Sequence, residues 1–99
     1  MKKQASKTID EIRGKTFSFS VILRGYRTRE ELTQEKLAKM LGVTKSYISD
    51  LENQRRYVTV EQAKAFAKKL KEPTVLWVET AIQDMLERAG VEGSVKIVA

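Results

Sequence analysis

The chain has 99 residues, which allow one domain or one domain with a short appendage, and its hydrophobic fraction of 41% is enough for a core. Cysteine and histidine are absent, so disulfides, thiolate metal sites and the commonest general base are excluded, and we expect no cofactor. No apolar run is long enough to span a membrane, and the basic N-terminus lacks the apolar stretch of a secretory signal. We therefore expect a cytoplasmic protein with no bound metal and no membrane partner.

Charge is distributed unevenly along the chain. Residues 1–71 contain 17 Lys and Arg against 8 Asp and Glu, a net charge of +9, whereas residues 72–99 contain 2 against 5, a net charge of −3. The first part suits a polyanion such as nucleic acid, and the last part does not. On charge alone, an ordinary basic domain is as good an interpretation as a nucleic-acid-binding one.

The spacing of apolar residues predicts five helices after a polar N-terminal arm, residues 1–16, which we expect to be loose or only partly helical. The first helix lies over residues 17–28 and is weakened by Gly25. Thr33 is a suitable N-cap for a second helix over residues 34–41, because its hydroxyl can accept a free helix N–H.

The remaining helices follow similar signals. Thr44 can cap a third helix over residues 45–53, and Thr59 opens a fourth, with Gln62 placed to complete a capping box. Pro73 ends the fourth helix, because proline disfavours helix in the residue before it. We therefore expect a helix-turn-helix domain over residues 17–73.

Residues 74–99 are expected to form a C-terminal helix and a tail. Thr74 is the predicted cap of this fifth helix, which ends at Gly90. The tail, SVKIVA, is rich in β-branched residues and could form a short strand. The fold class predicted for the whole chain is all-α.

A short turn, Gly42–Val43–Thr44, joins the second and third helices. Gly42 lies where a left-handed residue is needed, and Ala38 supplies a small side chain where the helices would cross. Two short helices joined in this way form a helix-turn-helix, in which the first braces the second in the DNA major groove. The apolar residues expected to face the body are Leu37, Leu41, Val43, Ile48 and Leu51.

The segment LTQEKLAKMLGVTKSYISDLENQRR, residues 32–56, resembles the helix-turn-helix of the Cro/C1-type (XRE) repressors, and the likeness extends from about Phe19 to Leu70. The resemblance implies a five-helix, lambda-repressor-like DNA-binding bundle whose third helix reads bases. It also implies two-fold dimers on a double-stranded, pseudo-palindromic operator. A Gly commonly follows the third helix in this family where this chain has Gln54, which is a departure from the pattern.

By this resemblance, the base-reading positions are Lys45, Ser46, Tyr47, Ser49 and Asp50. Lys45 can donate to guanine O6 and N7, Ser46 can pair with several base edges, and Asp50 can accept from cytosine N4. Asp50 also brings a negative charge close to phosphates, so it could instead reject wrong sequences. The alternative is that all five are solvated residues on a helix surface.

Phosphate contacts are expected at two helix N-termini and in the loop after the third helix, at Thr33, Gln34, Thr44, Asn53, Gln54, Arg55 and Arg56. Amides at a helix N-terminus can hold a phosphate, and the loop donors can grip the same backbone. The alternative for the two arginines is a solvated turn. The resemblance further implies an ion pair between Arg27 and Glu52 that holds the reading helix on the body.

The fifth helix has an apolar face wide enough for two surfaces. Val75, Val78, Ile82, Met85 and Ala89 follow one another at intervals of three and four residues, a seam suited to another helix. The predicted dimer interface is Val75, Trp77, Val78, Ile82 and Met85. The alternative is that the bundle buries this face itself. The tail, residues 95–98, could pair with its mate across a two-fold axis, cap the domain edge or lack fixed structure.

These patterns predict a sequence-specific DNA-binding regulator, acting as a homodimeric repressor of its own or other genes. The alternative is an antitoxin, because proteins of this length with one such domain resemble the HigA-type antitoxins, which also neutralise a toxin protein. An enzyme is not expected, since no Gly-rich phosphate loop or carboxylate pair accompanies the lack of His and Cys. RNA is a less suitable ligand, because the aromatic residues show no strand-like stacking pattern.

Overall fold

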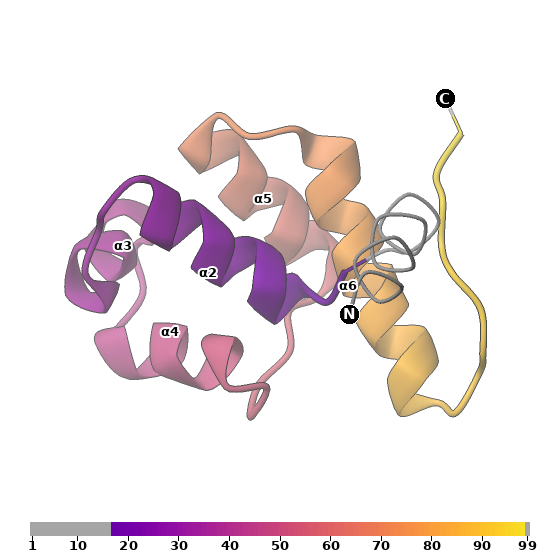
Figure 1. Cartoon of the computed structure of the whole chain (residues 1–99). Helices are drawn as coiled ribbons and strands as arrows, with labels where there is room; N and C mark the ends of the chain where they lie inside the picture. The colour runs from indigo at the N-terminus through magenta and orange to yellow at the C-terminus, as the bar shows by residue number, and fades with distance from the viewer. Residues whose placement is uncertain (1–16, 99) are drawn as a thin grey trace, which may run out of the picture.

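The computed structural model of the chain describes residues 17–98, and the arm predicted over residues 1–16 lies outside the described residues. Within the described part, five helices and no strand form a small bundle, which confirms the all-α prediction (Figure 1). The helices are α2 (Phe19–Arg29), α3 (Gln34–Leu41), α4 (Lys45–Glu52), α5 (Val60–Leu70) and α6 (Thr74–Arg88). None of these helices is long and apolar enough to cross a membrane.

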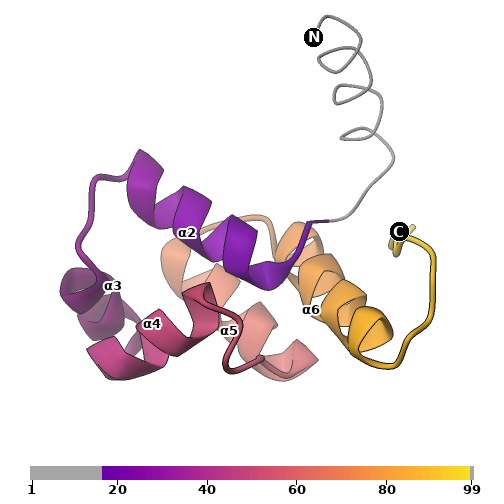
Figure 2. The ribbon, with the colours of Figure 1, turned by 60° about the horizontal axis from the view of Figure 1, so that its bottom comes forward.

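The bundle has two ends, and α2 connects them. α3 packs against α4 at one end, and α5 packs against α6 toward the other (Figures 1 and 2). α2 contacts both α4 and α6, while α3 contacts α5. The chain after α6 turns back and runs beside that helix, at the end of the molecule remote from α3.

The predicted threonine N-caps of the second, third and fourth helices are confirmed. The hydroxyl oxygens of Thr33 and Thr44 each accept a helix N–H at 3.0 Å. Thr59 and Gln62 exchange two hydrogen bonds of 3.0 Å in a complete capping box. The first helix begins two residues later than predicted, because the Ser18 hydroxyl caps it. Local hydrogen bonds of this kind fix where a helix begins.

The predicted cap of the fifth helix is wrong. Pro73 is the N-cap of α6, and no side chain caps this helix. The Pro73 carbonyl already accepts the Trp77 N–H at 3.3 Å, so Thr74 is the first residue inside the helix and cannot cap it. Proline has the fixed φ that suits a helix start and has no N–H to satisfy there.

The strand that the tail could have formed is absent from the described residues. The tail instead lies extended beside α6, where the Gln83 side-chain oxygen accepts the Val95 N–H at 2.9 Å. Glu79 accepts the Ile97 N–H at 2.6 Å. A ladder needs a second strand, and the described part of this chain does not supply one, so two helix side chains hold the backbone instead.

Trp77 lies in the centre of the core, with none of its surface exposed, so its predicted place in a dimer interface is wrong. Its ring packs edge-on against Phe19, with centroids 5.6 Å apart, and against Tyr26 at 6.2 Å. Trp77, Ala81 and Asp84 recur at intervals of four and three residues, and all three are buried. That stripe is the inner face of α6.

Candidate nucleic-acid interface

The turn between α3 and α4 has the geometry that its glycine predicts. Gly42 has a φ of 74°, a left-handed conformation that glycine adopts without steric cost. The N–H of Val43 donates to the carbonyl of Ala38 at 2.9 Å and closes the end of α3. Ala38 is buried, as expected for the small residue in this motif. The turn therefore sets α4 at a fixed angle to α3.

One face of α4 is buried and the other is open. Ile48 and Leu51 are buried in the core and attach the helix to the body. Lys45 and Ser46, at the N-terminal end of α4, are exposed, and neither makes an ion pair or side-chain hydrogen bond within the described residues. Their donor groups are therefore available to another molecule.

A buried carboxylate holds the C-terminal end of α4, which confirms the predicted ion pair. Glu52 accepts two hydrogen bonds from Arg27, at 2.6 and 2.9 Å, and a third from Gln34 at 3.1 Å. Burial alone would raise the pKa of Glu52, but the hydrogen bonds from Arg27 and Gln34 and the charges of Arg27 and Arg24 outweigh it and lower the pKa. Gln34 thus braces α4, a role that its sequence position did not predict.

The loop after α4 folds its two arginines over the open face of that helix. Arg55 donates to the Asp50 carboxylate at 3.0 Å and to the Ser49 hydroxyl at 3.4 Å. The Arg56 guanidinium lies 4.9 Å from the centre of the Tyr47 ring. Exposed ion pairs contribute only about 0–1 kcal/mol, so these cations can exchange their partners for phosphate at little cost.

Gln54 has the backbone conformation that a glycine in this position would have. Its φ is 59°, and a left-handed non-glycine residue costs roughly 1–2 kcal/mol. The side-chain amide offsets part of that cost by donating to the hydroxyls of Ser18, at 3.3 Å, and Ser20, at 3.0 Å. Gln54 therefore adopts the left-handed conformation that suits a glycine, and its side chain ties the loop to the start of α2.

A helix-turn-helix family model matches residues 23–77, which is more than half of the chain. The chain belongs to the XRE-type helix-turn-helix family. It is therefore a DNA-binding transcription regulator. No curated protein and no solved structure gives a significant match to the chain.

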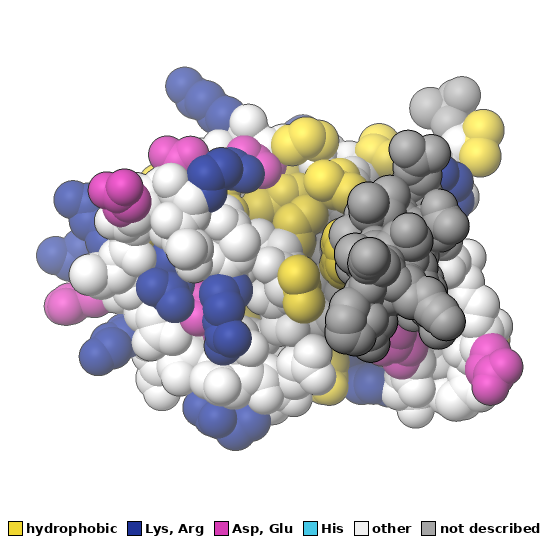
Figure 3. Space-filling view, in the orientation of Figure 1, with side chains coloured by type: hydrophobic (Ala, Val, Ile, Leu, Met, Phe, Trp, Pro, Cys, Tyr) yellow, Lys and Arg dark blue, Asp and Glu magenta, His cyan; other side chains and the backbone are white. Residues whose placement is uncertain are grey.

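In this XRE-type regulator, the residues predicted to contact DNA lie on α4, at the N-termini of α3 and α4, and in the loop that follows α4. Lys and Arg side chains gather over the α2, α3 and α4 end in Figure 3, and a hydrophobic area lies between α2 and α6. The α6 residues predicted for dimerisation belong to the opposite end of the bundle. The structure thus separates the two predicted surfaces.

Two further cations brace the motif, and the sequence pattern did not single them out. Arg24 donates to the carbonyl of Glu52 at 3.2 Å, and Lys69 donates to the carbonyl of Leu41 at 3.1 Å. Each cation therefore lies at the C-terminus of a motif helix, where positive charge is favourable. Arg24 precedes Arg27 by three residues, so the two share a helix face, and this spacing could have predicted that Arg24 also lies near Glu52. Lys69 comes from a distant helix, and no local pattern predicts its contact with Leu41.

Proposed function

We propose that this protein is a sequence-specific repressor that binds a double-stranded operator as a homodimer, possessing one reading helix for each half-site. The open face of α4 carries this proposal, because Lys45 and Ser46 are exposed on a helix whose opposite face is buried. In a two-fold dimer the two α4 helices would enter successive major grooves, about 34 Å apart. A bound dimer would block transcription from the site. We propose that the protein acts in the cytoplasm.

Specificity in this proposal comes from three side chains. Lys45 would donate to guanine and Ser46 to a neighbouring base edge. Asp50 is held by Arg55 in the free protein, at 3.0 Å. When Arg55 turns to a phosphate, the Asp50 carboxylate would be released to accept from cytosine N4. The phosphate contact, which is independent of sequence, would thus free Asp50 for a base-specific contact.

Phosphate contacts would come from Arg55, Arg56 and Asn53 in the loop, and from the N-termini of α3 and α4. Each phosphate neutralised by a cation releases condensed counterions, so the logarithm of affinity should fall with the logarithm of salt by about 0.9 for each contact. The expected salt dependence is therefore steep for any DNA sequence.

The proposed dimer uses the outer seam of α6. Val75 and Met85 are nearly half exposed, and Val78 and Ile82 are partly exposed, so apolar surface remains after the bundle has formed. Trp77 is excluded from this surface by its burial. Burying the seam against a second copy would remove it from water.

A fluorescence-anisotropy titration at two salt concentrations tests the proposal, with DNA from upstream of the gene and a shuffled copy of it. The wild-type protein should prefer the upstream DNA. Lys45→Ala should lose about 1–3 kcal/mol of that preference, whereas Lys68→Ala, which alters an exposed lysine on α5, should not. Equal binding of both DNAs at every salt concentration would contradict a sequence-specific repressor.

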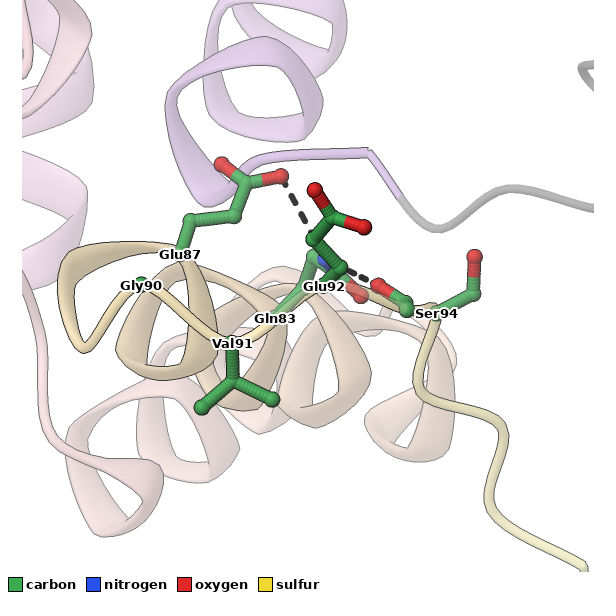
Figure 4. Close-up of a pocket in the computed structure, with 7 residues that line it drawn as sticks. Gln83, Glu87, Gly90, Val91, Glu92 and Ser94 are labelled. Carbon is green, nitrogen blue, oxygen red and sulfur yellow. Dashed lines mark hydrogen bonds between the residues drawn. The ribbon is translucent and has the colours of Figure 1, made fainter.

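A second candidate is an antitoxin, and an acidic cavity supports it. The cavity, of about 630 Å³, lies between the end of α6 and the turn after it, and Glu87, Glu92 and Gln83 line it (Figure 4). Such a site suits a basic side chain of a partner protein. Co-expression with the product of the adjacent gene would test this role: a co-purified complex that Glu87→Gln weakens is expected, and no complex would contradict it.

A further inference from the structure

A groove of about 380 Å³ lies on the exposed side of α2, beside the last residue of α4. The residues that line it are Ser20, Val21, Arg24, Gly25, Thr28 and Glu52. All of them except Glu52 belong to α2, which crosses the front of the bundle in Figure 1 with α4 below it. Its volume is in the range of small-molecule sites, and none of the residues predicted to contact DNA lines it.

The groove exists because α2 has no side chain at Gly25. A Cβ atom added there would meet no other atom within 4 Å, so the glycine leaves open space and is not required by a tight contact. Glycine inside a helix is less stable than alanine, and packing does not explain it at this position. Val21, one turn earlier on the same face, is half exposed. The bundle therefore leaves an unfilled apolar surface on α2.

The accessible charge in the groove is positive. The side chain of Glu52 is fully buried and already accepts hydrogen bonds from Arg27 and Gln34. The side chain of Arg24 is half exposed, and its Nη2 donates to the Glu52 carbonyl at 3.2 Å, while its Nε lies 3.5 Å from the Glu52 carboxylate. Its Nη1 makes no hydrogen bond within residues 17–98. The outer edge of the guanidinium, formed by Nη1 and the second N–H of Nη2, can therefore donate two parallel hydrogen bonds to an anion.

We propose that this groove binds a small apolar carboxylate. The carboxylate would accept both hydrogen bonds from the outer edge of Arg24, and the apolar part would lie over Gly25 beside Val21. Glu52 uses the other edge of the same guanidinium, so the ligand can bind without breaking the contact between Arg24 and the end of α4. The inference goes beyond the proposed function and does not depend on it, because the groove is present in the free protein.

The size of the groove and its charge favour a small anion over a protein partner. Six residues line the groove, whereas a stable protein interface uses about 20–30 residues on each side. A neutral ligand would leave the outer edge of Arg24 without an acceptor, and a cationic one would be repelled by it. A ligand with few atoms in a groove that is open on one side binds weakly, so we expect a dissociation constant of about 1 mM.

An NMR titration of the full chain with hexanoate tests the proposal. The backbone amide signals of Val21, Gly25 and Thr28 should shift and reach saturation, while that of Lys68, an exposed residue of α5, should stay in place. Hexan-1-ol and hexylammonium have the same alkyl chain but cannot accept the paired hydrogen bonds as an anion does. Both should bind at least about tenfold more weakly than hexanoate.

Two substitutions at Gly25 separate filling of the groove from removal of the glycine. Gly25→Leu places a large side chain in the groove and should abolish the hexanoate shifts, whereas Gly25→Ala adds one methyl group and should keep most of the binding. Both should unfold at a temperature equal to or above that of the wild type, because a glycine inside an exposed helix face is replaced. Arg24→Lys keeps the charge but loses the two-bond geometry, and it should weaken hexanoate about tenfold.

Three results would overturn the inference. Hexanoate that causes no saturable shift would do so, as expected if the groove serves a partner protein instead. Equal binding of hexanoate, hexan-1-ol and hexylammonium would show that Arg24 does not select an anion. Equal affinity of Gly25→Leu and Gly25→Ala would place the ligand elsewhere. None of these results bears on the repressor proposal, since Gly25→Leu leaves the open face of α4 intact and should bind operator DNA as the wild type does.

Discussion

Glu52 and Asp84 are both buried carboxylates, each 5% exposed, and α2 contacts both of them. Glu52 is the last residue of α4 and is bound by Arg27, with the charge of Arg24 close by, so its pKa is lowered despite its burial. Asp84 lies on α6, where burial and the charge of Glu87 raise its pKa. Hydrogen bonds from the Phe19 N–H, at 3.1 Å, and from Ser18, with the charge of Arg88, offset this rise only in part. One end of the molecule therefore stabilises a buried negative charge, and the other tolerates one.

The difference shows how the two ends are built. The α4 end adds a charged network around Glu52 to its apolar core contacts, so part of its stability depends on ionisation. The α6 end is held by apolar packing around Trp77, and its buried polar groups contribute little to its stability. Four predictions test this contrast, from the largest expected effect to the smallest.

Trp77→Ala should have the largest effect. Removing a fully buried tryptophan leaves a cavity and should cost about 3–5 kcal/mol of unfolding free energy. Met85→Ala, on the exposed face of the same helix, should cost about 0.5 kcal/mol or less. Urea unfolding of both variants measures the difference. A Trp77→Ala protein that lost dimerisation but kept the stability of its monomer would place Trp77 in an interface after all.

Glu52→Gln should have the next largest effect. It leaves Arg27 partly buried without its carboxylate partner and should cost about 2–3 kcal/mol, less than a fully buried pair would. Thermal unfolding measures the loss, with Glu61→Gln, an exposed residue of α5, as the control. Because the end of α4 would no longer be held, operator affinity should also fall. An unchanged melting temperature would show that the pair with Arg27 does not anchor α4.

Acid should act on the two carboxylates with opposite signs. Because the folded pKa of Glu52 is lowered, its contribution is present above the unfolded pKa of about 4.3 and is lost as pH falls through the folded value. Asp84 has a raised folded pKa, so its unfavourable contribution is removed as pH falls through that value. Urea unfolding between pH 7 and 3 should show a shallower loss for Glu52→Gln than for the wild type. Parallel profiles would contradict the assignment to Glu52.

Asp84→Asn should have the smallest effect. The amide oxygen can still accept the Phe19 N–H, and the buried charge is gone, so stability at pH 7 should be unchanged or rise by at most about 1 kcal/mol. Thermal unfolding at pH 7 and pH 4 measures it, and the gain should shrink at the lower pH. A clear loss of stability at pH 7 would show that the α6 end needs the charge.

Much of the fold could be predicted from the sequence because its signals are local. The bounds of α3 follow from Thr33 and Gly42, and the start of α4 follows from Thr44. Thr74 was misleading, since the preceding proline takes the capping position. The ion pair between Arg27 and Glu52 was predicted by family resemblance alone, because 25 residues separate the two partners.

The rest depends on contacts between distant segments. The apolar face of α6 is too continuous for its spacing alone to show that Trp77 points inward and Met85 outward. The bonds from Gln54 to Ser20, and from Gln83 to the tail, exist only once the helices are assembled. The same holds for the ion pair between Asp50 and Arg55. The sequence predicted Arg55 only as a phosphate contact, not as a partner of Asp50.

The first turn of α2 is a shared attachment point. The Phe19 N–H is bound by Asp84 of α6, and the next side chain, Ser20, is bound by Gln54 of the loop after α4. The Phe19 amide hydrogen can therefore exchange with solvent only when this turn moves away from α6. Such an opening would also disturb the loop beside α4. Hydrogen exchange at this one amide would therefore report how often the first turn of α2 opens.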